Sequence, residues 1–175
     1  YLSNQLDAPA IVYIHGLGTS KEDFWSVLEH PELSKKFTLL FADLVGHGDS
    51  SSPSDFSYSM EDQANSLLQL LQHQAISEKI ILIAHSMGGP IAISLAEKLG
   101  EQVKAIIYAE GNIDEGDCTF SKYIVEAFSL KEWKTEGFKN TLASLQKNIG
   151  TGAYAKTFAK AGATAIYLSA KDLYL

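Results

Sequence analysis

The sequence predicts an α/β fold, in which a doubly wound, mostly parallel β-sheet carries a helical cap. Two observations lead to this prediction. Short, continuous apolar runs alternate with amphipathic segments as far as Glu110, which is the pattern of a parallel sheet covered by helices. Beyond Glu110, apolar residues recur at helical spacing without a clear buried run, which indicates a further layer made of helices.

Four apolar runs are predicted to be the strands of this sheet. Each run is short and rich in aliphatic residues, as strands buried on both faces are. The four runs are Ala10–His15, Phe37–Ala42, Lys79–Ala84 and Val103–Ala109. Because amphipathic segments separate them, right-handed crossovers would place all four in one parallel sheet.

Three helices are predicted to connect these strands. Ser20 can cap the first, with Asp23 at its third position as in a capping box. Ser59 opens the second helix with Asp62 in the same relation, and leucines follow on one face. The third helix, Pro90–Leu99, stops at a glycine, a residue type common at helix C-termini.

The change in pattern after Glu110 predicts two parts of the chain. Residues 1–111 would form the sheet and its helices, and residues 112–175 the cap. One segment of the cap, Ala165–Ser169, could instead be a fifth strand. We favour a helix there, because the apolar period continues to the C-terminus at Ala163, Ile166, Ala170 and Leu173.

Composition and charge exclude several classes of partner. The chain has 175 residues, of which 46% are hydrophobic and 20% charged, as in ordinary globular proteins. Its formal net charge is −7, and all of its basic residues are Lys, so no clustered basic face for nucleic acid is expected. No apolar run is long enough for stable membrane insertion. The expected partner is therefore a small molecule, and the sequence makes no prediction about oligomeric state.

Cysteine and metal-ligand patterns narrow the chemistry further. Cys118 is the single cysteine, so no intrachain disulfide can form, and we expect it to be structural in a cytoplasmic protein. No His, Cys, Asp and Glu cluster has metal-ligand spacing, so neither a metal nor an organic cofactor is expected.

The segment that joins the third predicted strand to the third helix carries a candidate nucleophile, Ser86. A sharp strand-to-helix turn needs small residues two positions before and after the nucleophile, here Ala84 and Gly88. Such a turn lifts the serine hydroxyl above the sheet at a helix N-terminus, where amides face a developing oxyanion. Taken alone, the same pattern also suits an ordinary helix-capping serine.

Two further motifs close the first and second predicted strands. They are His15-Gly16-Leu17-Gly18 and the segment Asp43–Ser50, which reads D-x-x-G-H-G-x-S. In this order before Ala84-His85-Ser86-Met87-Gly88, they resemble the α/β-hydrolase superfamily over about residues 10–110. Ala84 departs from that family's more usual glycine, which is a minor difference because alanine is also small.

The resemblance implies an esterase-like serine hydrolase (EC 3.1.1 type) that works through an acyl-enzyme. The backbone amides of Leu17 and Met87 would form the oxyanion hole, with His15, Gly16 and His85 as supporting residues. The apolar cap and the absence of Arg favour a carboxylic ester or thioester of a small, neutral to hydrophobic substrate. Alternatives on the same scaffold are C–C hydrolase, perhydrolase or lyase chemistry, or a non-catalytic binding or signalling module.

Glu110, at the end of the fourth predicted strand, is the candidate acid of the triad. The chain order serine, acid, histidine fits this position, because some family members place the acid after this strand. Asp114 and Asp117 are the rivals within the chain. The family's more usual acid position would lie beyond Leu175.

The catalytic base is the residue that the sequence does not supply. Serine needs an adjacent base, normally His, and in this family that His follows the last strand. None of the five histidines, at positions 15, 30, 47, 73 and 85, occupies such a place. We therefore expect the chain to be incomplete at both ends and the 175 residues alone to be inactive.

Overall fold

A five-stranded sheet forms the centre of the fold in the computed structural model, which describes residues 1–4 and 6–175. In sheet order the strands are β1 (Leu2–Ser3), β3 (Thr38–Phe41), β2 (Ala10–Ile14), β4 (Ile80–His85) and β5 (Val103–Ala109). The last four pair in parallel, which confirms the predicted sheet, and β1 pairs antiparallel with β3. The sequence analysis did not predict β1, because two residues are too few to show a period.

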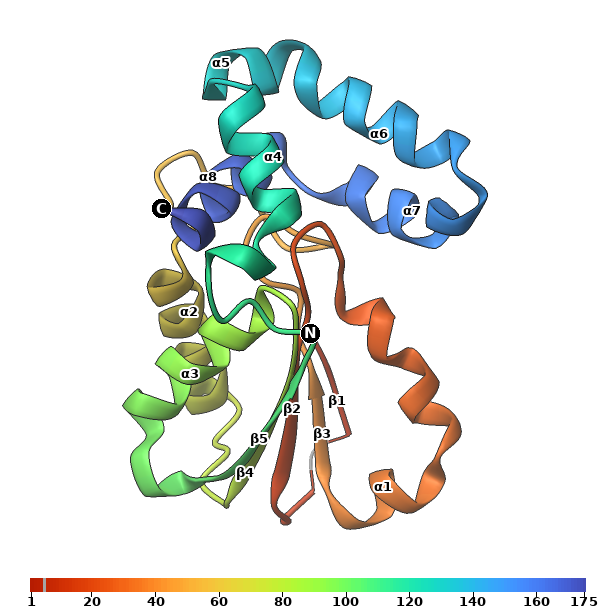
Figure 1. The fold of residues 1–175 in the computed structure, drawn as a ribbon. Coiled ribbons are helices and arrows are strands. Elements are labelled where there is room, and N and C mark those ends of the chain that lie inside the picture. The colour runs from red at the N-terminus through yellow and green to blue at the C-terminus, as the bar shows by residue number, and fades with distance from the viewer. Residues whose placement is uncertain (5) are drawn as a thin grey trace.

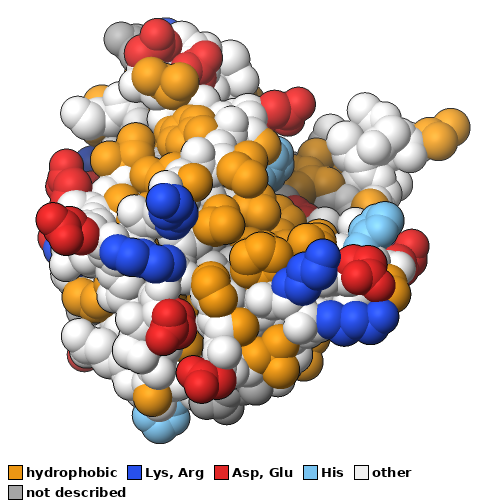
Figure 2. Space-filling view, turned by 90° about the horizontal axis from the view of Figure 1, so that it is seen from below, with side chains coloured by type: hydrophobic (Ala, Val, Ile, Leu, Met, Phe, Trp, Pro, Cys, Tyr) orange, Lys and Arg blue, Asp and Glu red, His pale blue; other side chains and the backbone are white. Residues whose placement is uncertain are grey.

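Burial differs sharply between the middle and the edge of the sheet. Every residue of β2 and β3 is buried, as their continuous apolar sequences predict. The edge strand β5 is mostly exposed, and Ile106 and Ile107 are 38% and 53% exposed. Figure 2 shows hydrophobic side chains gathered across the middle of the face seen from below.

Helices cover both faces of the sheet (Figure 1). On one face lie α2 (Met60–His73) and α3 (Gly88–Leu99), and on the other lie the 3₁₀ helix η1 (Lys21–Glu29) and α1 (Pro31–Lys36). The predicted cap at Ser59 is present, since its hydroxyl accepts the Asp62 amide at 3.1 Å. The capping box predicted with Asp23 is wrong, because the Ser20 hydroxyl accepts the Glu22 amide and the segment is a 3₁₀ helix.

The remaining helices lie together above the carboxyl ends of the parallel strands (Figure 1). They include the α-helices α4 (Thr119–Ala127), α5 (Leu130–Glu132), α6 (Phe138–Lys147), α7 (Gly152–Lys160) and α8 (Ala163–Tyr174). A π-helical turn, η4 (Trp133–Gly137), joins α5 to α6, and short 3₁₀ turns are η3 (Glu115–Asp117) and η5 (Ile149–Thr151). A further 3₁₀ turn, η2 (Gly100–Gln102), lies at the opposite end of the sheet, where α3 leads into β5. The segment Ala165–Ser169 lies within α8, which confirms the helical interpretation over the strand.

These upper helices, α4–α8, share a hydrophobic core with the sheet. One continuous cluster of buried residues includes Leu17 and Met87 from the sheet connections and Trp133, Phe158 and Ile166 from the upper helices. The Trp133 indole donates to the carbonyl of Ala163 at 2.9 Å, which satisfies the polar atom of a fully buried ring. The upper helices are therefore packed directly against the carboxyl end of the sheet. Within the described part of the chain, no helix combines the length and the apolarity that crossing a membrane requires.

Candidate active site

Ser86 lies at the tip of a sharp turn between β4 and α3. Its φ of 52° is in the left-handed region, which non-glycine residues rarely adopt. The backbone is held on both sides: the Ser86 amide donates to the Ala109 carbonyl at 3.0 Å, and the Ser86 carbonyl accepts the Gly89 amide at 2.8 Å. A strained serine between a strand end and a helix start matches the geometry of a nucleophile elbow.

Small residues around Ser86 allow neighbouring elements to approach closely. A Cβ added at Gly16 would lie 3.1 Å from the Ser86 Cβ, so the turn after β2 touches the serine. A Cβ at Gly89 would lie 2.0 Å from the Tyr108 ring, which packs flat against the start of α3. Ala84 is fully buried on β4, the strand that lies between β2 and β5.

His15 braces the turn that faces Ser86. Its Nε2 accepts the Leu44 amide at 2.9 Å, so the proton sits on Nδ1, which contacts the Gly16 carbonyl at 2.8 Å. The ring is fully buried, and desolvation lowers the pKa of His15 below its ordinary value. With both nitrogens engaged in one neutral tautomer, His15 is suited to holding loops and not to accepting a proton.

The two predicted oxyanion-hole amides, those of Leu17 and Met87, belong to two different turns. Leu17 follows Gly16 directly, and Met87 follows Ser86 as the residue before α3. Among the described residues, neither amide donates to a backbone or side-chain acceptor. Buried amides are nearly always hydrogen-bonded. Two amides without an internal acceptor beside a serine are therefore suited to donate to an oxygen atom of a bound ligand.

Glu110 follows β5 directly and also has a left-handed backbone, with a φ of 48°. Its carboxylate is 89% exposed and lies 3.5 Å from the His85 imidazole, measured from Oε2 to Nε2. His85 therefore lines the same cavity as Ser86 and lies beside the predicted acid. No hydrogen bond joins any histidine to Ser86 Oγ in the described part of the chain.

Asn112 is a site residue that the sequence analysis missed. Ser86 Oγ donates to Asn112 Oδ1 at 3.2 Å, and the Asn112 amide nitrogen donates to the Asp117 carbonyl at 2.8 Å. Tyr108 fixes the backbone of the same residue, because its hydroxyl donates to the Asn112 carbonyl at 2.9 Å. A lone Asn in a polar loop carries no local signal, so only the folded chain identifies it.

A cavity of about 320 Å³ opens above Ser86. It is lined by residues from the turn after β2, from the loop after β5 and from the upper helices, among them Leu17, Phe120, Tyr154 and Leu173. The candidate residues Gly16, Leu17, His85, Ser86 and Glu110 all line it, so the structure brings most of the predicted site together.

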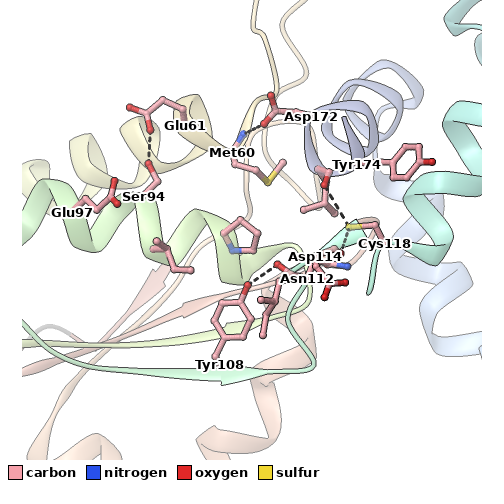
Figure 3. Close-up of a pocket in the computed structure, with 14 residues that line it drawn as sticks. Met60, Glu61, Ser94, Glu97, Tyr108, Asn112, Asp114, Cys118, Asp172 and Tyr174 are labelled. Atoms are coloured by element: carbon pink, nitrogen blue, oxygen red, sulfur yellow. Dashed lines mark hydrogen bonds between the residues drawn. The ribbon is translucent and has the colours of Figure 1, made fainter. Parts of the chain in front are cut away.

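A second cavity of about 510 Å³ lies beside the first, across the loop that follows β5. Figure 3 shows it between α2, α3 and the end of α8, with Glu61, Ser94 and Tyr108 along its walls. Ser86 does not line it, so its larger size does not make it the better candidate for chemistry. Within residues 1–4 and 6–175, no cluster of three His, Cys, Asp or Glu side chains could hold a metal ion.

The loop that carries the D-x-x-G-H-G-x-S motif supports the site without reaching it. Asp43 accepts the backbone amides of Lys21 and Asp49, at 2.8 and 3.0 Å, and its side chain is only 2% exposed. His47 is fully buried, and burial together with the neighbouring His15 lowers its pKa to about 3. His47 is therefore neutral at ordinary pH and, like His15, acts as a structural residue.

A family model described as alpha/beta hydrolase fold matches residues 9–156 of the chain. Lipase 1 of Psychrobacter immobilis is 33% identical over 96 residues, which are 55% of this chain and 29% of the lipase. The magnesium-chelatase 30 kDa subunit of Rhodobacter capsulatus is 36% identical over 90 residues, 51% of this chain and 31% of the subunit. The chain thus spans under a third of the length of these curated relatives.

Among solved structures, a carboxylesterase from Nitrososphaera gargenis superposes with a TM-score of 0.78. The match covers 99% of this chain and 66% of the carboxylesterase, at 21% sequence identity. At that identity the similarity shows a shared fold, and it agrees with the sheet order and upper helices described above.

Proposed function

The chain belongs to the α/β-hydrolase fold family, and on that basis we propose that it carries the nucleophile of a serine hydrolase. The reaction is cleavage of a carboxylic ester or thioester through an acyl-enzyme on Ser86. The observation that carries this proposal is the left-handed Ser86 at the β4–α3 turn, next to Met87 and in contact with the turn that holds Leu17, two residues whose amides have no acceptor among the described residues.

Attack by Ser86 Oγ on the scissile carbonyl turns the carbonyl oxygen into an oxyanion. The Leu17 and Met87 amides are proposed to donate hydrogen bonds to this oxyanion, and the N-terminus of α3 adds a favourable dipole. Removing one donor of an oxyanion hole typically costs about 3–4 kcal/mol of transition-state stabilisation. The oxyanion collapses to the acyl-enzyme as the bond to the alcohol or thiol breaks, and that leaving group takes the serine proton from the base. Water then attacks the acyl-enzyme and releases the carboxylic acid and Ser86.

Glu110 is proposed to orient the imidazole that acts as base. It lines the Ser86 cavity, and its exposed carboxylate already lies beside an imidazole, that of His85. The rivals have other partners: Asp117 accepts the amides of Ile113 and Asp114, and Asp114 accepts the amide of Gly116. Those carboxylates shape the loop after β5, so Glu110 is the one available to an imidazole.

The base itself is proposed to be a histidine other than the five of this chain, since none of them bonds to Ser86 Oγ in the part of the chain that the structure describes, and those at positions 15 and 47 are the least suited. Both of these are fully buried with lowered pKa values, which makes them poor proton acceptors. His30 and His73 are exposed at the ends of η1 and α2, away from the cavity. Without a histidine on Ser86 Oγ, we expect negligible turnover by these 175 residues alone.

The substrate is proposed to be small and neutral to hydrophobic. A cavity of about 320 Å³ holds a small acyl group, and Phe120, Tyr154 and Leu173 give it apolar walls. Its charged lining residues are Glu110 and Asp117, and no Lys is among the described residues that line it. An anionic substrate would meet like charge there without a compensating cation.

A fluorophosphonate probe tests the nucleophile directly, because it phosphonylates activated serines. On the full-length protein, wild type should be labelled and Ser86→Ala should not. Ser94→Ala is the matched control, since Ser94 lies on α3 but its hydroxyl binds Glu61 in the neighbouring cavity. Equal labelling of wild type and Ser86→Ala, or no labelling of wild type, would refute the proposal, and the second result would favour a non-catalytic module.

The proposed acid is tested by Glu110→Gln with Asp114→Asn as its control. An amide at position 110 keeps the shape but cannot stabilise an imidazolium, so kcat should fall by about 10²–10⁴-fold. Asp114→Asn should retain kcat, because its carboxylate binds only a loop amide. If Glu110→Gln kept wild-type kcat, another acid would have to be sought.

A further inference from the structure

The helix α7 places one tyrosine hydroxyl on the turn that carries the Leu17 amide. Tyr154 lines the Ser86 cavity, and its hydroxyl donates to the Leu17 carbonyl at 3.0 Å. Burial raises the pKa of Tyr154, so the hydroxyl keeps its proton and remains a donor at any pH at which an esterase works. The contact joins residues 137 positions apart in the sequence.

Gly18 shows how closely α7 approaches the turn. Its φ is 70°, and a Cβ there would lie 2.5 Å from the Phe158 ring and 2.9 Å from the Tyr154 hydroxyl. Glycine is needed both for the left-handed backbone and for this close contact. Tyr154 and Phe158, which lie one helical turn apart on α7, therefore both contact the chain at Gly18.

The peptide plane before Leu17 is fixed from the opposite side. The Gly16 carbonyl contacts His15 Nδ1 at 2.8 Å and accepts the Thr19 hydroxyl at 3.1 Å. Because a trans peptide is planar, the Leu17 N–H points opposite to that carbonyl, away from His15 and Thr19. Tyr154 holds the next plane, between Leu17 and Gly18, so Leu17 is constrained on both sides.

We propose that Tyr154 is a positioning residue for the oxyanion hole, which holds the Leu17 peptide so that its amide stays directed at the oxyanion. The inference rests on the proposed serine-hydrolase function and adds a role for α7 in it. An oxyanion hole works because its donors are fixed before charge develops. A turn released from Tyr154 can tilt, and the Leu17 amide then loses alignment in the transition state more than in the substrate complex.

Tyr154→Phe in the full-length enzyme tests the role, because it removes the hydroxyl and keeps the aromatic ring at the cavity. Loss of transition-state stabilisation alone should lower kcat about tenfold for a p-nitrophenyl ester, with KM changed less than twofold. The rate of phosphonylation by the fluorophosphonate probe should fall by a similar factor. A purely structural role would lower neither per folded molecule.

Tyr167→Phe is the matched control. Tyr167 lies on α8, and its hydroxyl donates to the Phe128 carbonyl at 3.0 Å, a bond of the same type that does not touch the Ser86 cavity. The two variants should lose similar thermal stability, whereas only Tyr154→Phe should lose kcat.

Three outcomes decide the matter. A tenfold loss of kcat in Tyr154→Phe but not in Tyr167→Phe supports the inference. Equal kcat in wild type and Tyr154→Phe overturns it, while inactivity of Ser86→Ala leaves the proposed function standing. If Ser86→Ala keeps its activity, the proposed function and this inference fall together.

Discussion

Gly88 lies so close to Ile14 that a Cβ at position 88 would come within 2.4 Å of the Ile14 carbonyl oxygen. The first turn of α3 thus packs directly against the end of β2, because the glycine at position 88 has no side chain to separate them. This contact fixes the helix start against the turn that carries Leu17. It explains in physical terms why the position two residues after Ser86 must be glycine.

Gly88→Ala should destabilise the fold by about 1–3 kcal/mol, because the added methyl group meets rigid backbone and forces β2 and α3 apart. Denaturant unfolding measures the change. Gly152→Ala is the control: Gly152 begins α7, and a Cβ there meets nothing within 4 Å. That substitution should be neutral or stabilising by up to about 1 kcal/mol. Equal stability of Gly88→Ala and wild type would contradict the predicted clash.

The strain at Ser86 predicts an order of stability among inactive variants. At a φ of 52° any side chain costs about 1–2 kcal/mol, whereas glycine adopts this backbone freely. Ser86→Gly should therefore be more stable than Ser86→Ala by about 1 kcal/mol, although neither is active. Thermal unfolding of the two variants checks this. A higher melting temperature for Ser86→Ala would show that the turn is not strained.

The sequence predicted the parts of the fold that rest on local patterns. The four parallel strands follow from short, continuous apolar runs rich in aliphatic residues, although the edge strand β5 is mostly exposed and not buried on both faces as its sequence suggests. The turn at Ser86 follows from small residues at fixed positions around one serine. The strands are decided within a few neighbouring residues, whereas the serine turn also needed the motifs that follow the first and second predicted strands.

The missed parts depend on contacts between distant residues. Tyr154 and Asn112 reach the site only because α7 and the loop after β5 fold over it, and neither residue stands in a recognisable motif. The 3₁₀ form of η1 was missed because apolar spacing does not separate it from an α-helix over nine residues. The contact of His85 with Glu110 follows from the neighbouring positions of β4 and β5 in the sheet.

Acid should destabilise the protein through His47. The pKa of His47 is about 3 in the folded state, against an ordinary value of 6.5. Between these two values the unfolded chain binds a proton at His47 and the folded chain does not. The stability that this group contributes is complete above pH 6.5 and is lost as the pH falls toward 3. Relative to pH 7.5, the loss at pH 5 should be about 2 kcal/mol.

Denaturant unfolding at several pH values measures this slope. His47→Asn should be less stable at neutral pH but should lose less stability between pH 7.5 and pH 5 than wild type does. His15, whose pKa is also lowered by burial, leaves a remaining slope of the same sign. His73→Asn, at the exposed end of α2, should keep the wild-type slope. If His47→Asn kept the full slope as well, the acid sensitivity would have another source.

The stability of the loop after β3 should depend on Asp43. Burial alone would raise the pKa of Asp43, but hydrogen bonds from Lys21 and Asp49 outweigh it and lower the pKa. A Cβ at Gly48 would come within 2.3 Å of the Asp43 carboxyl carbon, so the loop wraps tightly around this charge. Asp43→Asn removes the charge and leaves the Lys21 ammonium, whose side chain is 11% exposed, without its buried partner.

Asp43→Asn should therefore destabilise the fold by about 2–4 kcal/mol at neutral pH, which is typical for breaking a buried pair. Asp49→Asn is the matched control, since Asp49 pairs with the same lysine but is 69% exposed and should change stability little. Equal losses in the two variants would mean that the contribution comes from the lysine's exposed contacts. A loss confined to Asp43→Asn would assign the stabilising contribution to the buried carboxylate, which joins the segment after β3 to the beginning of η1.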